Sequence, residues 1–122
     1  YTVATLGTEV YDQGGNFANP TFTAPVTGRY RFCGGVGVNQ LGAGHTQGTL
    51  AVATSNRSRT LLQEKMSATA TAGTDLAVCG CVQADMDASD TATLTITVFS
   101  STLTVDMLSD VDKTFFSASL MH

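Results

Sequence analysis

The sequence predicts an all-β protein, an antiparallel sandwich or barrel, and three observations lead to this prediction. Several short stretches alternate apolar and polar residues, which places the apolar side chains on one face of a strand. Turn-forming clusters of Gly, Asn, Asp and Ser separate these stretches at regular intervals. No window keeps apolar residues at helical spacing for three turns. Many short strands spaced in this way are typical of sandwiches and barrels.

In the first 27 residues, the sequence predicts two extended segments separated by turns. Residues 2–11 alternate loosely and are expected to form a strand. Phe17 and Phe22 flank Asn19-Pro20, which indicates a turn or a sheet edge. Pro25 lacks a backbone donor, so the short strand before it is expected to stop there.

Residues 28–38 are expected to form the strongest strand of the chain. Tyr30 and Phe32 are two residues apart and therefore share one face, while Arg29 and Arg31 share the other. Gly residues after this point keep side chains out of the strand, which often marks close approach by another part of the protein.

The middle of the chain predicts three more strands and two loops. The strands are expected over 49–54, 60–66 and 76–84, although 60–66 also allows one helical turn. The loops are expected at 39–47 and 67–74, which have no pattern that faces a core.

The last third predicts an acidic turn at 85–90 and three alternating segments. Residues 91–99 alternate cleanly, with Leu94 and Ile96 pointing inward. A shorter run covers 103–107, and the closing strand is expected over 114–121.

Length, composition and charge limit the classes of function. The 122 residues fit a single domain over 1–122, and only 13% of them are charged, so the surface depends on Thr, Ser, Gly, Asn and Gln. A net charge of −4 argues against nucleic acid, and no run approaches the roughly 20 apolar residues that cross a membrane. The chain shows no initiator Met and no signal peptide, so we expect it to be the C-terminal head of a longer chain.

The three cysteines do not indicate a disulfide framework, because their number is odd. Cys79-Gly80-Cys81 is one residue too short for the Cys-x-x-Cys of zinc and redox sites. We therefore favour small buried thiols over a metal site. A disulfide from Cys33 to Cys79 or Cys81 is the alternative.

The segment Phe22-x5-Gly28-x-Tyr30-x-Phe32, preceded by Tyr11-Asp12 and Phe17, resembles the signature of the C1q-type globular head. That family belongs to the C1q and tumour necrosis factor-like jelly rolls. The acidic turn and strand over 84–98, and the closing segment over 114–120, are similar to later parts of the family pattern. The sequence of this segment resembles C1q-type heads of bacterial and phage proteins, which cap tail fibres and spikes, more than it resembles animal complement heads.

Parts of the chain depart from the family pattern. Gly15, Ser89 and Ala118 replace residues that are usual in the family, and residues 39–73 match none of its motifs.

The resemblance implies an antiparallel jelly-roll β-sandwich that assembles as a homotrimer, with 28–38 and 76–84 adjacent in the inner sheet. The face of that sheet away from the core would then turn toward the three-fold axis. Arg31 would need a carboxylate or carbonyl partner, for which a neighbouring chain is one source. The predicted subunit contacts are Arg31, Cys33, Cys79 and Cys81.

No catalytic site, metal site or cofactor is predicted. The sequence has no Gly-x-Ser-x-Gly motif, and His45 is its only histidine before the terminus. Asp85-x-Asp87-x-x-Asp90 offers three carboxylates but lacks the Gly and Glu of a calcium-binding EF-hand loop. Some C1q-type heads bind calcium, so calcium is the alternative, and we expect hydrated turn residues instead.

The first functional hypothesis is a non-enzymatic, homotrimeric recognition head of a viral or phage tail fibre or spike. It would lie on the virion surface or outside the cell and bind a cell-surface glycan or protein through its loops. The alternatives are a structural trimerisation or capping module, a eukaryotic secreted C1q-like ligand and, last, a hydrolase. The expected ligand-binding residues are Asn39, Gln40, His45, Gln47, Asn56 and Arg57.

Overall fold

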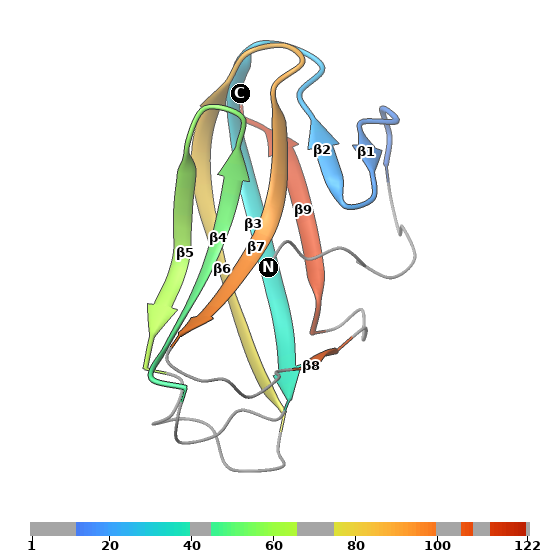
Figure 1. The fold of residues 1–122 in the computed structure, drawn as a ribbon. Coiled ribbons are helices and arrows are strands. Elements are labelled where there is room, and N and C mark those ends of the chain that lie inside the picture. Colours follow the sequence, from blue (N-terminus) through green and yellow to red (C-terminus); the bar gives the residue numbers. More distant parts are fainter. Residues whose placement is uncertain (1–11, 40–44, 66–74, 100–105, 109–112, 122) are drawn as a thin grey trace.

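The computed structural model describes residues 12–39, 45–65, 75–99, 106–108 and 113–121. They form two antiparallel sheets that pack face to face as a β-sandwich (Figure 1), which confirms the predicted all-β class. The strand expected at 2–11 and the loop expected at 67–74 lie outside the described residues. Within the described part, no helix is long and apolar enough to cross a membrane.

The first sheet has five strands in the order β1-β2-β7-β4-β5. Its long strands are β7 and β4, which pair over the whole length of β4. β1 and β2 form a short hairpin in which Phe17 lies opposite Phe22, and a cis Asn19-Pro20 bond lies in its turn. The strands are β1 (Phe17–Ala18), β2 (Thr21–Thr23), β4 (Gln47–Thr54), β5 (Ser58–Glu64) and β7 (Thr91–Phe99).

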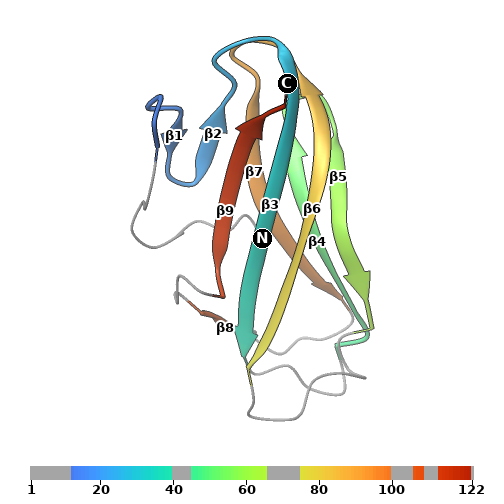
Figure 2. The same ribbon diagram turned by 180° about the vertical axis from the view of Figure 1, so that it is seen from behind.

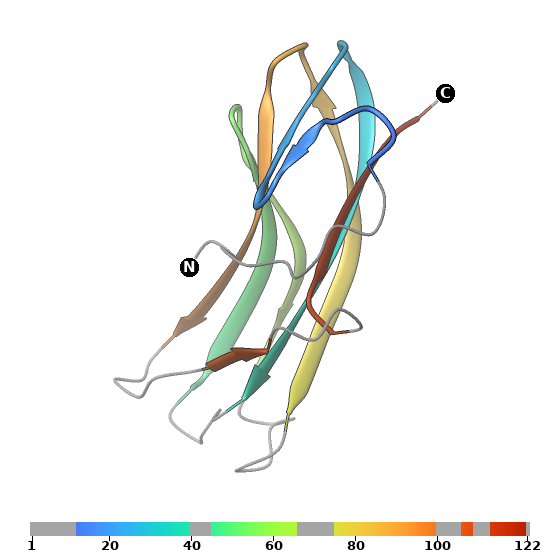
Figure 3. The same ribbon diagram turned by 90° about the vertical axis from the view of Figure 1, so that its right-hand side faces the viewer.

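The second sheet is built on β3, which pairs with β6 along one side. Along its other side β3 pairs with β9 over Tyr30–Gly35 and with β8 over Gly37–Asn39. The strands are β3 (Gly28–Asn39), β6 (Leu76–Met86), β8 (Asp106–Leu108) and β9 (Phe115–Leu120). Figure 2 shows this sheet in front, and Figure 3 shows the two sheets edge-on as separate layers.

The core lies between the sheets and contains the apolar residues that alternate along each long strand. Tyr30 and Phe32 are buried, as their two-residue spacing predicts, and Leu94 and Ile96 face them from β7. The rings of Phe22 and Tyr30 have centroids 5.5 Å apart and meet edge to face. The aromatic residues of the Phe22–Phe32 segment therefore join the two sheets.

The strand bounds correct two sequence-based expectations. β5 is extended over Ser58–Glu64, so the helical turn that 60–66 also allowed is wrong for these residues. β6 continues to Met86, which makes Asp85 a strand residue and shortens the acidic turn. Of the run expected over 103–107, only Asp106 and Met107 lie among the described residues.

Candidate functional site

The outer face of the β6-β3-β9 sheet is the surface that sequence analysis predicted to contact neighbouring chains. Phe32, Gly34 and Val36 alternate along β3 on its core side, so Arg31, Cys33 and Gly35 point away from the core. The register places matching outward residues on both neighbouring strands. We define the outer face as Arg31, Cys33, Gly35, Cys79, Cys81, Gln83, Phe115, Ser117 and Ser119.

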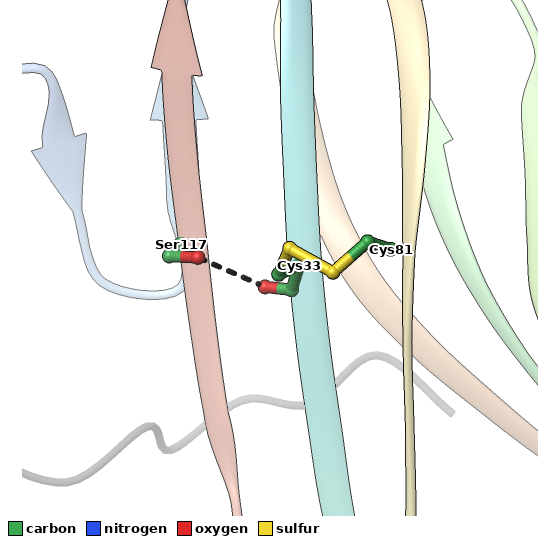
Figure 4. Close-up of a disulfide and its surroundings, with 3 residues drawn as sticks. All are labelled: Cys33, Cys81 and Ser117. Atoms are coloured by element: carbon green, nitrogen blue, oxygen red, sulfur yellow. Dashed lines mark hydrogen bonds between the residues drawn. A yellow bond between two sulfur atoms is a disulfide. The ribbon is translucent and has the colours of Figure 1, made fainter.

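A disulfide joins β3 to β6 at the centre of the outer face (Figure 4). Cys33 and Cys81 lie directly opposite each other in the register, with Cα atoms 4.1 Å apart. The hydroxyl of Ser117 on β9 donates a 3.4 Å hydrogen bond to the carbonyl oxygen of Cys33. The centre of the face is thus linked across three strands.

The predicted set of small buried thiols is wrong, and one of its two disulfide alternatives is present. Cys81, not Cys79, pairs with Cys33, because the register sets Cys79 opposite Gly35. Cys79 is free and exposed on the outer face.

Phe115 covers the glycine position of the outer face. A Cβ atom placed on Gly35 would lie 2.5 Å from Cε1 of Phe115, so the ring lies across the bare backbone of β3. The side chain of Phe115 is nevertheless 37% exposed. A large apolar group is therefore presented to solvent beside the Cys79 thiol.

Charge on this sheet is concentrated at its two ends. Arg29 pairs with Asp85 at 2.8 Å at one end, and Lys113 pairs with Asp75 at 3.2 Å at the other. Between them Arg31 is exposed, and within the described residues its side chain makes no hydrogen bond or ion pair. The middle of the face thus carries a single unpaired guanidinium among Ser, Gln, Cys and Phe side chains.

The residues expected to bind a ligand fall at opposite ends of the sandwich. Asn39 and Gln47 lie at the lower end in Figure 1, and Asn56 lies at the upper end. The eight residues of β4 separate these ends, a length of roughly 26 Å at about 3.3 Å per residue. One site within one chain therefore cannot contain both groups.

Two of the expected ligand contacts are further restricted by their surroundings. His45 is only 1% exposed, so its side chain is not presented on the surface, contrary to the sequence-based expectation. The amide nitrogen of Asn39 donates to Asp75 at 2.8 Å. Gln40 lies outside the described residues.

Three turns meet at the upper end of the sandwich, and we call residues 24–28, 55–57 and 87–90 the end-loop cluster. The carboxylate of Asp90 joins two of these turns by accepting hydrogen bonds from Ser55 Oγ at 2.8 Å and Asn56 Nδ2 at 2.6 Å. It also accepts one from the backbone N–H of Asp87 at 2.9 Å. The hydrogen bonds, led by that of Asp87, hold the pKa of Asp90 below its ordinary value, against a smaller opposing effect of burial.

Asp85 borders the same cluster and is committed to an ion pair. Its hydrogen bond to Arg29 is the main cause of a lowered pKa, to which the charges of Arg59 and Arg57 add. The motif Asp85-x-Asp87-x-x-Asp90 therefore does not converge on one point, because Asp85 faces Arg29 while Asp90 faces Ser55 and Asn56. Among the described residues, no group of three His, Cys, Asp or Glu side chains could hold a metal ion.

A comparison of the chain with protein-family models finds no match, and a comparison with curated proteins finds none either.

Proposed function

We propose that this chain is the homotrimeric recognition head of a fibre or spike, with a jelly-roll fold and with the outer face as its subunit contact. The observation that carries the proposal is the composition of this face. Its middle has an exposed ring, a thiol and an unpaired arginine, and among the described residues its charged pairs lie at the two ends. Cores of subunit contacts are depleted in charge and enriched in aromatic residues and arginine.

The order of strands supports the jelly-roll part of the proposal. The chain passes from β2 in one sheet to β3 in the other, returns for β4 and β5, crosses again to β6, and then places β7 and β9 in opposite sheets. Repeated crossing between two antiparallel sheets is the connectivity that double-sheet jelly rolls use.

Copies of the same chain are the occupant that best fits the outer face. Its polar groups are mainly Ser hydroxyls, the Gln83 amide and the Arg31 guanidinium, which suit neutral carbonyl and hydroxyl partners like those on the face itself. In a closed assembly each copy supplies both surfaces of the contact, so Arg31 can take a neighbour's oxygen as its partner. The Cys33–Cys81 disulfide supports a location outside the cell or on a virion, where oxidised cysteine pairs persist.

Light scattering of the purified domain tests the assembly. We expect a trimer at micromolar concentration and a monomer after Arg31→Glu, because the substitution buries repelling carboxylates around one axis. Arg57→Glu is the matched control, since Arg57 lies in the end-loop cluster and should leave the trimer intact. A monomeric wild-type domain, or an unaffected Arg31→Glu trimer, contradicts the proposed contact.

Binding to host cells separates recognition from the structural alternative. A recognition head should bind cells or surface glycans as an isolated trimer, with avidity from three equivalent sites. A trimer that binds no cell-surface glycan or protein would instead be a capping module that only holds a fibre together.

A further inference from the structure

We infer that an open pocket in the end-loop cluster, lined by both polar and apolar groups, is a saccharide-binding site. The cavity has a volume of about 400 Å³, within the range of small-molecule sites. It opens beside the outer face, since Arg29 and Asp85 pair with each other two positions along the strands from Arg31 and Gln83 and point to the same side of the sheet. The lining residues are Thr27, Gly28, Arg29, Asn56, Asp85, Met86 and Asp87. The inference deepens the proposed recognition function by naming a site and a ligand class for it.

The walls of this pocket are held in place before any ligand arrives. The buried Tyr30 donates from its hydroxyl to the carbonyl oxygen of Val26 at 2.7 Å, which fixes the turn that contains Thr27. The hydroxyl of Thr27 in turn accepts the backbone N–H of Ala88 at 3.1 Å. Asp90 fixes the remaining wall through its hydrogen bonds to Asn56 and to the backbone of Asp87. Such fixed walls reduce the ordering cost of binding.

The polar groups of the pocket match hydroxyl groups better than they match a simple ion. Asp85 and Asp87 supply carboxylate acceptors, while Arg29 and Asn56 supply donors. The two carboxylates and one guanidinium sum to a charge of only −1, with Arg57 close by in sequence to Asn56. Each hydroxyl of a sugar both donates and accepts, so neighbouring hydroxyls can use carboxylate and donor groups together.

Among the aspartates of this region, Asp87 makes the weakest side-chain contacts with the rest of the protein. Asp85 is held by Arg29 at 2.8 Å, and Asp90 is not part of the pocket lining. The carboxylate of Asp87 is exposed, and its one side-chain contact within the described residues is a 3.5 Å contact with the Thr27 hydroxyl. We therefore assign Asp87 as the main acceptor for a ligand hydroxyl, with Asn56 beside it as donor.

Titration of the ¹⁵N-labelled domain with single sugars tests the inference. The probes are glucose, galactose, mannose and N-acetylglucosamine at millimolar concentrations, and we expect at least one to shift the amides of Thr27, Asn56 and Asp87. Loss of a hydrogen bond to a charged group should weaken binding roughly tenfold in Asp87→Asn. Glu64→Gln, the same change at the opposite end of β5, is the control and should bind as the wild type does.

Three results would overturn the inference: no shift with any of these sugars, shifts elsewhere only, or an Asp87→Asn variant with unchanged affinity. Shifts of these amides with N-acetyl-lysine methylamide and none of the sugars would also overturn it, in favour of a cation site. Light scattering on the same samples keeps the two proposals apart. If a monomeric domain shows the sugar-induced shifts, the saccharide site is supported and the proposed trimer is wrong. If the domain is a trimer but shows no such shifts, the trimer is supported and the saccharide site is wrong.

Discussion

The hydroxyl of Tyr30 donates a 2.7 Å hydrogen bond to the carbonyl oxygen of Val26, four residues earlier in the chain. The Tyr30 ring is buried between the sheets, while Val26 is exposed in the turn before β3. A core residue thus fixes the position of a surface turn. The same turn lines the proposed pocket, so the packing of the core controls the geometry of the end-loop cluster.

Removing the hydroxyl in Tyr30→Phe should lower the free energy of unfolding by about 0.5–1.5 kcal/mol, the net contribution of one hydrogen bond. Tyr30→Ala should cost about 3–5 kcal/mol, because it also removes a buried ring. Urea unfolding of the two variants separates the hydroxyl from the ring. Equal losses of unfolding free energy in Tyr30→Phe and Tyr30→Ala would mean that the buried ring adds nothing to stability, which would contradict its packing between the sheets.

Breaking the Cys33–Cys81 disulfide should lower stability by up to about 4 kcal/mol, since it closes a loop with a sequence separation of 48 residues. The double variant Cys33→Ala/Cys81→Ala and the reduced wild type should both show the loss in urea unfolding. Cys79→Ser is the matched control, because an exposed thiol should change stability by no more than about 0.5 kcal/mol. If reductant leaves the stability of the wild type in urea unchanged, the Cys33–Cys81 disulfide is not present as assigned.

Stability should fall in acid because Asp12, Asp85 and Asp90 all have lowered pKa values in the folded chain. A carboxyl whose folded pKa lies below its unfolded value of about 3.9 stabilises the fold at higher pH, and this contribution is lost as the pH falls through the folded pKa. The urea concentration at the unfolding midpoint should therefore be constant near neutral pH and should decrease as the pH falls below about 4.

The variant Asp90→Asn tests the share of one carboxylate in this acid response. It should be less stable than the wild type at pH 7, because a neutral amide accepts the hydrogen bonds of Ser55, Asn56 and Asp87 less strongly. The gap should narrow as the pH falls toward 2, when the wild-type carboxylate is also neutral. A constant gap across this range would show that Asp90 does not stabilise the cluster through its charge.

Adjacent glycines on opposite faces of β3 should respond differently to the same substitution. In Gly34→Ala the new Cβ would lie 2.5 Å from Cδ1 of the buried Leu94, which predicts an overpacking cost of about 1–3 kcal/mol. In Gly35→Ala the near atom belongs to the exposed ring of Phe115, which can move into solvent. We expect a smaller loss there, measured by urea unfolding. A larger loss for Gly35→Ala would contradict the assigned faces.

The alternation of residues was enough to predict which side chains face the core. Tyr30 and Phe32 are buried, and Cys33 and Cys81 share the opposite face, because a strand sends successive side chains to opposite sides whatever its neighbours are. The pairing of Cys33 with Cys81 could not be predicted in the same way. It depends on the register of β3 against β6, and a shift of two residues would have set Cys79 opposite Cys33.

The end-loop cluster was the part that sequence reasoning missed. Asn56 was predicted as a ligand contact, but in company with His45, which is buried, and Gln47, which lies at the other end of β4. The acidic turn predicts a hydrated Asp90, whereas in the structure its carboxylate joins two turns. The sequence does show three polar turns, at 24–28, 55–57 and 87–90, but it does not show that these turns lie next to one another in the folded chain.

By itself the sequence determined the all-β class, the inward faces of the long strands and the end of the strand before Pro25, because these depend on local geometry and on the burial of apolar side chains. Only the tertiary structure decided the disulfide partner, the burial of His45 and the meeting of residues 24–28, 55–57 and 87–90. These features join segments that are far apart in the chain, and their contacts follow from strand order and register, which local patterns do not encode.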